Sequence, residues 1–176
     1  MQILDFIQSN MRSGFFDVVM PIITSLGNGG IIWILIALAL IATQKYRMAG
    51  VTILAALLMH LLIGNVILKP LIARVRPCDV NTAIELLIPR PTDYSFPSGH
   101  TMSSFAAATV IIRTDKRMGI FAMLLATVIA FSRLYLYVHY PSDVVGGIVI
   151  GIALGVFASC VIAKFAKESR PERNGC

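Results

Sequence analysis

Apolar residues in this chain fall in long runs separated by short polar or charged breaks. Residues 49–68 and 144–163 form two runs of the length that one membrane crossing needs, about 20 apolar residues. Shorter runs cover residues 30–43, 101–112 and 118–131. This pattern predicts a series of membrane-spanning helices joined by short loops.

The N-terminal stretch, residues 1–26, is apolar but is interrupted by charges. Asp5, Arg12 and Asp17 break the run that extends from Ile3 to Leu26. The stretch fits a surface helix followed by a tilted first span, and it equally fits a wholly interfacial segment. We favour the first arrangement, which brings the number of crossings to six.

The composition supports a membrane protein. Of the 176 residues, 57% are hydrophobic and only 14% are charged, and the mean hydropathy of +0.80 exceeds that of an ordinary soluble domain. We therefore expect an all-α, polytopic membrane helix bundle that forms one domain over residues 1–176. The spans leave no room for a large soluble domain.

The net charge of +6 has a simple explanation in such a bundle. Basic residues outside the motifs described below gather in three clusters: Lys45 and Arg47; Arg113, Lys116 and Arg117; Lys164, Lys167, Arg170 and Arg173. Six alternating crossings place all three clusters on one side, which the positive-inside rule makes cytoplasmic. Residues 164–176 would then form a basic cytoplasmic tail. These charges suit anionic lipid headgroups, so no nucleic-acid partner is expected.

Three short segments hold most of the residues with chemical potential. They are Lys69-x6-Arg76-Pro77, Pro97-Ser98-Gly99-His100, and Ser132-Arg133-x5-His139-x3-Asp143. Each segment lies at the end or the start of a predicted span, and alternation brings all three to the same outer face of the membrane. Charged residues at such depth are costly and usually functional, so their convergence predicts a site.

The first segment offers two cations for a phosphate group. Lysine provides a point charge and arginine a bidentate fork, which suit a phosphoryl group and its equatorial oxygens. Lys69 and Arg76 are two helical turns apart, so they share a face if the helix persists past Pro70. Alone, the two residues would more often be snorkelling cations at a span end.

The second segment stands where an outer loop enters an apolar helix. Ser98 and the backbone amides near Gly99 would present donors at the positive end of that helix, where anions bind. His100 in that position can act as a general acid. Without the histidine, an ordinary capped helix start would be the preferred interpretation.

The third segment combines Arg133, as a further cation, with His139 and Asp143. The carboxylate is close enough to hold one ring nitrogen and leave the other free to attack, which is a nucleophile with its orienting partner. We expect Pro141 to impose a tight turn before the last span, with Ser142 or Asp143 capping that helix. Taken alone, such a pair is more often a surface hydrogen bond.

Together the three segments resemble the signature of the type 2 phosphatidic acid phosphatase superfamily, which includes membrane lipid phosphatases and soluble vanadium haloperoxidases. The resemblance covers residues 69–143 and extends to the flanking spans of compact bacterial members. It implies that His139 is a nucleophile that forms a phosphohistidine, with Asp143 as its partner and His100 as general acid. Lys69, Arg76, Ser98, Gly99 and Arg133 would hold the phosphoryl group, without a metal or other cofactor.

The resemblance also implies a substrate class. A compact bundle in the bacterial cytoplasmic membrane, with its site facing outside, favours a lipid phosphate or diphosphate, and undecaprenyl diphosphate is the first choice. Phosphatidylglycerol phosphate, phosphatidate and lipid A phosphate remain open, as does a non-catalytic lipid-phosphate binder or transporter. The oligomeric state is also open, and a monomer is compatible with every feature of the sequence.

A few further residues invite interpretation. Arg74 and Arg90 fit either a second phosphate or headgroup contact, or plain surface charge. His60 lies in mid-span, too deep for the site, and is expected to form an interhelical hydrogen bond. Glycines 147, 151 and 155 recur every four residues and predict a helix-packing face within the monomer.

Overall fold

The computed structural model describes residues 1–168, and all regular structure in that range is helical. The α-helices are α1 (Gln2–Asn10), α2 (Gly14–Leu26), α3 (Ile31–Ala42), α4 (Arg47–His60), α5 (Lys69–Ile72), α6 (Pro77–Val80), α7 (Gly99–Thr114), α8 (Lys116–Tyr135) and α9 (Pro141–Glu168). A short 3-10 turn, η1 (Asn28–Gly30), links α2 to α3, and a π-helical segment, η2 (Leu61–Leu68), links α4 to α5. The predicted all-α class is confirmed. The last part of the predicted basic tail, residues 169–176, lies outside the described residues.

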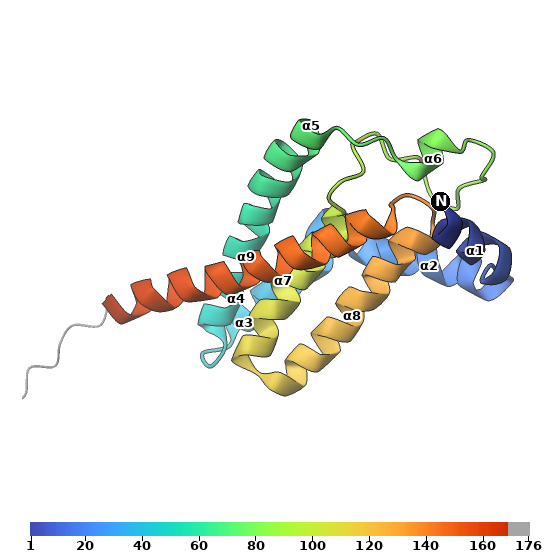
Figure 1. Cartoon of the computed structure of the whole chain (residues 1–176). Helices are drawn as coiled ribbons and strands as arrows, with labels where there is room; N and C mark the ends of the chain where they lie inside the picture. The colour runs from blue at the N-terminus through green and yellow to red at the C-terminus, as the bar shows by residue number, and fades with distance from the viewer. Residues whose placement is uncertain (169–176) are drawn as a thin grey trace, which may run out of the picture.

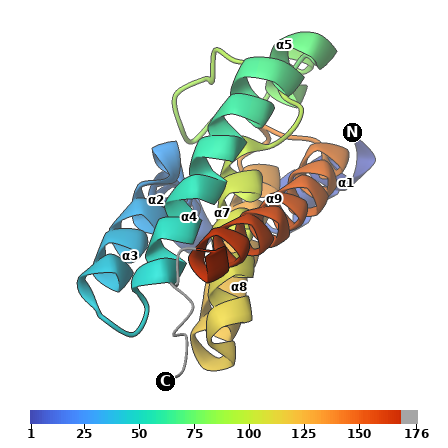
Figure 2. The ribbon, with the colours of Figure 1, turned by 90° about the vertical axis from the view of Figure 1, so that its left-hand side faces the viewer.

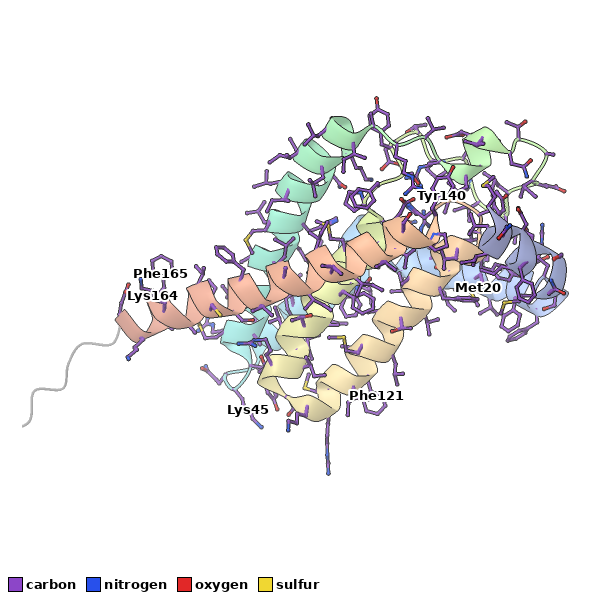
Figure 3. All side chains as sticks on the ribbon, viewed as in Figure 1. Met20, Lys45, Phe121, Tyr140, Lys164 and Phe165 are labelled. Carbon is purple, nitrogen blue, oxygen red and sulfur yellow. The ribbon has the colours of Figure 1, made fainter. Side chains whose placement is uncertain are left out.

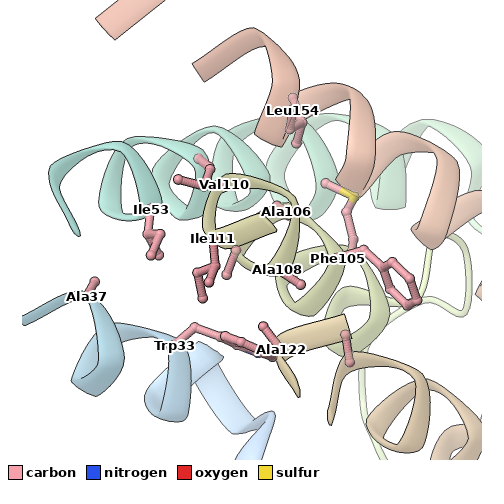
Figure 4. Close-up of a cluster of buried hydrophobic side chains, with 14 of the residues drawn as sticks. Trp33, Ala37, Ile53, Phe105, Ala106, Ala108, Val110, Ile111, Ala122 and Leu154 are labelled. Atoms are coloured by element: carbon pink, nitrogen blue, oxygen red, sulfur yellow. The ribbon is translucent and has the colours of Figure 1, made fainter. Parts of the chain in front are cut away.

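Helix α7 forms the centre of the bundle, surrounded by α4, α8 and α9 (Figure 1). Residues 101–111 of α7 are all buried, because apolar or small side chains occur on every side of this helix. Trp33 of α3 is fully buried, and its indole Nε1 donates to the Ser104 hydroxyl at 2.9 Å. The core around α7 therefore includes side chains from both halves of the chain (Figure 4).

The glycines of α9 allow this helix to approach α7 closely. A Cβ added at Gly151 would lie 2.5 Å from the backbone oxygen of Met102, and a Cβ at Gly155 would lie 2.6 Å from that of Ala106. Gly147 faces the backbone oxygen of Ser98 in the same way. The predicted glycine packing face is confirmed, and it lies inside the monomer.

The segment from η2 to the end of α5, residues 61–72, is called here the arm. It continues α4 and rises past the other helices, so that α5 lies at the edge of the molecule (Figures 1 and 2). Leu62, Val66 and Ile67 are exposed along it. The arm winds more widely than an α-helix, and the Lys69 N–H bonds to the Gly64 oxygen. Pro70 follows and has no N–H to donate, which weakens the regular α-helical pattern at this point.

The arm ends before Arg76, and this corrects one expectation. Ala73 adopts a left-handed conformation, with φ of 47°, and stops α5. Arg76 is extended and stands immediately before α6, which begins at Pro77. Lys69 and Arg76 therefore do not share the face of one helix, because left-handed Ala73 ends α5 between them.

Fewer of the described helices are long and apolar enough to span a membrane than the six crossings predicted from the sequence would need. In the part of the chain that the structure describes, three stretches are long and apolar enough to cross a membrane: Arg47–Val80, Lys116–Tyr135 and Pro141–Glu168. The pair Gly14–Leu26 and Asn28–Ala42, bent by 46°, makes a fourth if it is one broken span. Helix α7, with 16 residues, is shorter than these. Six crossings stay a prediction.

Residues 1–26 form two separate helices. Helix α1 has nine residues, too few to span a bilayer. It packs on the end of α8, where Gln8 Nε2 donates to the Tyr135 oxygen at 2.7 Å and the Tyr137 hydroxyl donates to Asp5 at 2.5 Å. Its opposite face exposes Phe6.

The basic clusters lie far from the three motif segments. The hydroxyl of Tyr46 donates to Asp115 at 3.1 Å, which joins the α3–α4 turn to the α7–α8 turn. Figure 3 shows Lys45 and Lys164 well away from Tyr140, which precedes α9 at the opposite end. The structure thus separates a basic end from an end that contains the motifs.

Candidate active site

A cavity of about 840 Å³ opens where α2, the arm, α7 and α8 come together. Six of the eight residues predicted for the site line it: Lys69, Arg76, Gly99, His100, Arg133 and His139. The other two, Ser98 and Asp143, are fully buried behind its wall. Three segments that are distant in the sequence therefore converge on one cavity.

Three hydrogen bonds hold the carboxylate of Asp143 in place. It accepts hydrogen bonds from the Ser95 hydroxyl at 2.5 Å, from Arg74 at 2.6 Å and from the Tyr140 N–H at 2.9 Å. Its Oδ2 also lies 3.6 Å from His139 Nδ1, slightly beyond hydrogen-bond distance. Nδ1 has no other partner among the described residues. The carboxylate is fixed behind the imidazole, in the position of an orienting group.

The start of α9 differs from the expected turn. Pro141 is the first helical residue, where its missing N–H costs nothing, and Tyr140 occupies the cap position. Asp143, the third residue of the helix, reaches back to the Tyr140 N–H as in a capping box. The expectation that Ser142 or Asp143 would be the cap is wrong, because proline is tolerated in the first turn of a helix.

Arg76 indicates the protonation state of His139. Its Nη1 donates to the Val138 oxygen at 2.7 Å and lies 3.0 Å from His139 Nε2. A guanidinium only donates, so we assign Nε2 as the unprotonated acceptor and Nδ1 as the N–H that points to Asp143. Burial lowers the pKa of His139, and Arg133 and Arg76 lower it further; Asp143 raises it, and the result is about 3. The imidazole is therefore neutral at pH 7, with the Nε2 lone pair directed at Arg76 Nη1.

Arg133 lines the cavity and is 4% exposed. One of its terminal nitrogens donates to the Thr24 hydroxyl of α2 at 2.5 Å. Its Nε has no hydrogen-bond partner in the described part of the chain. A buried guanidinium with a free donor is suited to an anionic oxygen.

His100 stands in the first turn of α7, and its Nε2 is 2.9 Å from the side-chain oxygen of Asn28. Gly27 gives this ring its space, since a Cβ there would lie 2.6 Å from His100 Cδ2. The sequence reasoning missed both Asn28 and Thr24 as site neighbours. The only sequence signal was the run Gly27-Asn28-Gly29-Gly30, which marks a turn but not its position beside α7.

Lys69 and Arg76 both pair with Asp93, a loop carboxylate that no sequence motif marks. Lys69 Nζ pairs with one oxygen of Asp93, and Arg76 Nη2 pairs with the other at 2.5 Å. Burial alone would raise the pKa of Asp93, but the hydrogen bond from Lys69 and the charge of Arg76 outweigh it and lower the pKa to about 2. Asp93 is therefore a carboxylate at neutral pH.

Arg74 and Arg90 both have partners in the protein. Arg74 pairs with Asp143, donates to the Ser142 hydroxyl at 2.7 Å and lies over the Tyr140 ring, 4.1 Å from its centroid. This position was not among the expected alternatives, because only the fold brings the α5–α6 connection to the start of α9. Arg90 pairs with Asp79 at 2.8 Å and lines the cavity. A contact between Arg90 and a second phosphate stays a prediction.

His60 forms the expected interhelical contact, since its Nε2 lies 3.3 Å from the Gly99 oxygen. It also lines the cavity, so the expectation that it lies too deep for the site is wrong. The reason is that the first residue of α7, Gly99, lies beside His60 at the end of α4. Within residues 1–168, no three His, Cys, Asp or Glu side chains form a group that could hold a metal ion.

Comparison with known proteins places this geometry in context. The family model described as the PAP2 superfamily matches residues 47–167. An undecaprenyl-diphosphatase of Sulfolobus acidocaldarius is 34% identical over 121 residues, which cover 68% of this chain and 58% of that relative. Undecaprenyl-diphosphatase BcrC of Bacillus subtilis is 32% identical over 148 residues, or 82% of this chain and 74% of the relative.

Two solved structures share the fold. The first is a transmembrane PAP2 type phosphatidylglycerolphosphate phosphatase from Bacillus subtilis, with a TM-score of 0.69, 27% identity, and coverage of 92% of this chain and 82% of that one. The second is Aquifex aeolicus LpxE, with a TM-score of 0.74, 26% identity, and coverage of 90% and 93%.

Proposed function

The chain belongs to the PAP2 superfamily, and from this premise we propose that it is a membrane lipid phosphatase acting through a phosphohistidine on His139. The observation that supports this most directly is that His139 lines the same cavity as Lys69, Arg76 and Arg133. Its Nε2 lies 3.0 Å from Arg76 Nη1, and Asp143 lies on the Nδ1 side of the ring. A neutral imidazole with an oriented lone pair is a competent nucleophile.

In the first step, His139 Nε2 attacks the phosphorus and the bond to the leaving oxygen breaks. Lys69, Arg76 and Arg133 bind the equatorial oxygens, where charge is held in the transition state. For a monoester, His100 enters the step protonated and donates its proton to the leaving oxygen. For a diphosphate, the lipid phosphate leaves as an anion without a proton, so His100 stays neutral, accepts the proton of water in the second step and then releases it to solvent. Asp143 stabilises the positive charge that develops on His139. In the second step, a water attacks the phosphorus, His100 takes its proton, and the phosphorus–nitrogen bond breaks to release phosphate. Ser98 and the Gly99 amide complete the predicted phosphate site.

The shape of the cavity supports a lipid substrate. Away from the cations, its wall is formed by apolar side chains of α3, α4 and the arm: Ile34, Leu54, Leu57, Leu58 and Leu61. Several of these are also exposed on the outer surface of the bundle, so the apolar wall continues to the surface that would face lipid tails. A phosphate at the cations therefore has an apolar path for its chain.

Undecaprenyl diphosphate is the substrate we favour, with undecaprenyl phosphate as the product. Two relatives carry undecaprenyl-diphosphatase as their name, at 34% and 32% identity. Phosphatidylglycerol phosphate, phosphatidate and lipid A phosphate are the alternatives, since relatives include phosphatidylglycerophosphatase B and a lipid A 4'-phosphatase. With its basic end in the cytoplasm, the six-span bundle would open this site to the outer face of a bacterial cytoplasmic membrane.

Phosphate release by the purified protein in detergent, with excess chelator, tests this function. Undecaprenyl diphosphate, phosphatidylglycerol phosphate and phosphatidate are offered at equal mole fraction. We expect the diphosphate to be hydrolysed fastest and His139→Ala to lose turnover by about 10⁴-fold or more, as removal of a nucleophile does. His60→Gln is the matched control, because glutamine can still donate to the Gly99 oxygen.

A quench experiment separates catalysis from binding. With ³²P-labelled substrate, the wild-type protein should retain an acid-labile, base-stable label that His139→Ala does not form. A protein that binds these lipids yet releases no phosphate and takes up no label is a lipid-phosphate binder or transporter, and the catalytic roles assigned above would then be wrong.

A further inference from the structure

The carboxylate of Asp93 occupies the place where a phosphate would meet its first two cations. One oxygen pairs with Lys69 Nζ and the other with Arg76 Nη2. Both cations are nearly buried, with 9% and 3% of their side chains exposed, whereas 50% of the Asp93 side chain is exposed. The carboxylate thus covers the cations from the open side of the cavity, in the bidentate manner of a phosphate group.

The backbone around Asp93 is fixed, and its side chain can leave without opening the loop. Arg76 Nε donates to the backbone carbonyl oxygen of Asp93 at 2.8 Å, and Arg76 Nη2 donates to the backbone carbonyl oxygen of Tyr94 at 3.3 Å. The Ser95 N–H bonds to the Arg74 oxygen at 2.8 Å. Rotation about the side-chain bonds of Asp93 is therefore sufficient to free both cations while the loop stays in place.

While the carboxylate is bound, Arg76 also covers the nucleophile. Its Nη2 holds Asp93 and its Nη1 lies 3.0 Å from His139 Nε2, on the lone pair that would attack phosphorus. An anion that replaces Asp93 must draw the guanidinium onto its own oxygens. Displacement of the carboxylate and exposure of the nucleophile are thereby coupled through one side chain.

Charge decides which anions can displace Asp93. Exchanging one singly charged group for another across two cations yields little net Coulomb energy, whereas a terminal phosphate or diphosphate carries about two or more charges. The ordinary phospholipids of a bilayer are phosphodiesters with a single charge, and they surround the site at high concentration. A resident carboxylate would therefore exclude them and still yield to a terminal phosphate.

Resting on the proposed function, we infer that Asp93 is a specificity-determining residue: it holds the phosphate-binding cations until a terminal phosphate or diphosphate displaces it, and it keeps out phosphodiester headgroups. Its role is competition for Lys69 and Arg76, and it takes no part in the bond-breaking step. This distinguishes it from a positioning residue, whose loss would weaken phosphate binding.

The test compares the wild-type protein with Asp93→Asn, which keeps the shape of the side chain and removes its charge. Phosphatidylglycerol is added to detergent micelles as a phosphodiester competitor of lipid-phosphate hydrolysis, and its inhibition constant is measured. We expect Asp93→Asn to lower that constant roughly tenfold, because Lys69 and Arg76 are then no longer occupied by a carboxylate and are free to bind the competitor. Glu85→Gln removes the same charge from an exposed position on the same loop, outside the cavity, and should leave the constant unchanged.

Calorimetric binding of orthovanadate, as a phosphate mimic, gives a readout that needs no turnover. It too should be tighter in Asp93→Asn. If the variant purifies poorly, Asp93→Ser serves the same purpose. An unchanged or weakened affinity for both anions would overturn the inference while hydrolysis by the wild type left the proposed function intact. If the wild type hydrolysed nothing but the variant bound vanadate more tightly, the proposed function would fail and the inference would stand.

Discussion

The α7–α9 pair and the arm both contribute residues to the candidate site, but the first is closely packed and the second is largely exposed. Along α7–α9, glycines bring the two backbones together so closely that no Cβ fits at Gly151, and residues 101–111 are all buried. The arm, residues 61–72, is π-helical in its first part and exposes apolar side chains along its length. One region is rigid by close packing, and the other has few neighbours.

The chemistry is divided between these two regions. His100 and Asp143 belong to α7 and α9, and His139 lies two residues before α9, so the groups proposed to break the bond stand on or beside the close-packed pair. Lys69 ends the arm, and Arg76 follows it in the connection to α6. The groups proposed for bond breaking thus lie on or beside close-packed elements. The two cations that pair with Asp93 have nearly buried side chains, but they are attached to the exposed arm and to the connection that follows it.

A kinetic comparison of one residue from each region should give the largest effect. Asp143→Asn removes the charge that orients His139 and stabilises its cationic form, so we expect kcat to fall on the order of 10³-fold with KM little changed. Lys69→Gln removes a cation that binds phosphate in the ground state as well as in the transition state, and should mainly raise KM, by about tenfold. Steady-state rates at fixed detergent concentration measure both kcat and KM. If both variants changed the same constant, the proposed division between the two regions would be contradicted.

Alanine at two glycines should separate the two regions by stability. A Cβ at Gly151 would lie 2.5 Å from the backbone oxygen of Met102, which cannot move without displacing α7. A Cβ at Gly64 of the arm would meet only the flexible side chain of Met102, with its methyl at 2.6 Å and its sulfur at 3.3 Å. We expect Gly151→Ala to destabilise the protein by about 2 kcal/mol or more and Gly64→Ala by under about 1 kcal/mol. Thermal unfolding in detergent gives the comparison, and equal losses would show that the arm packs as tightly as α9.

The smallest expected effect concerns the proton on His139. Its pKa is lowered to about 3 by burial first and by the neighbouring arginines, so the ring should stay neutral from pH 7.5 to pH 5. Nitrogen-15 NMR of the imidazoles would show this, with His139→Gln identifying the resonance. A titration midpoint near 6.5 would mean that the nucleophile is open to water.

The same pKa shift makes stability depend on pH in a defined direction. The unfolded chain takes up a proton on this histidine near pH 6.5, and the folded protein does so only near pH 3. Between these values the unfolded state binds more protons, so the contribution of His139 to the free energy of unfolding is present above pH 6.5 and is lost as the pH falls. In His139→Gln this part of the pH dependence should disappear.

The motif residues were predictable because their chemistry is local. Two cations, a helix start with a histidine, and a histidine four residues before a carboxylate each point to phosphate, and alternation of the spans brings them together. Asp93, Thr24 and Asn28 were not predictable in the same way. Each lies in a loop or a helix outside the three motifs. Each is linked to the candidate site only by a hydrogen bond to a residue 17 to 109 positions away in the sequence.

The sequence by itself determined the helical class, the membrane setting and the motif residues, most of which line the cavity, because hydrophobic run length and residue type act within a single segment. Only the tertiary structure decided that Asp93 covers the cations, that Arg74 clamps Asp143 and that the arm leaves its helical path before Arg76. Such pairings depend on how separate helices pack, and the energy of an ion pair follows from the distance between its charges in space, which the order of residues does not contain.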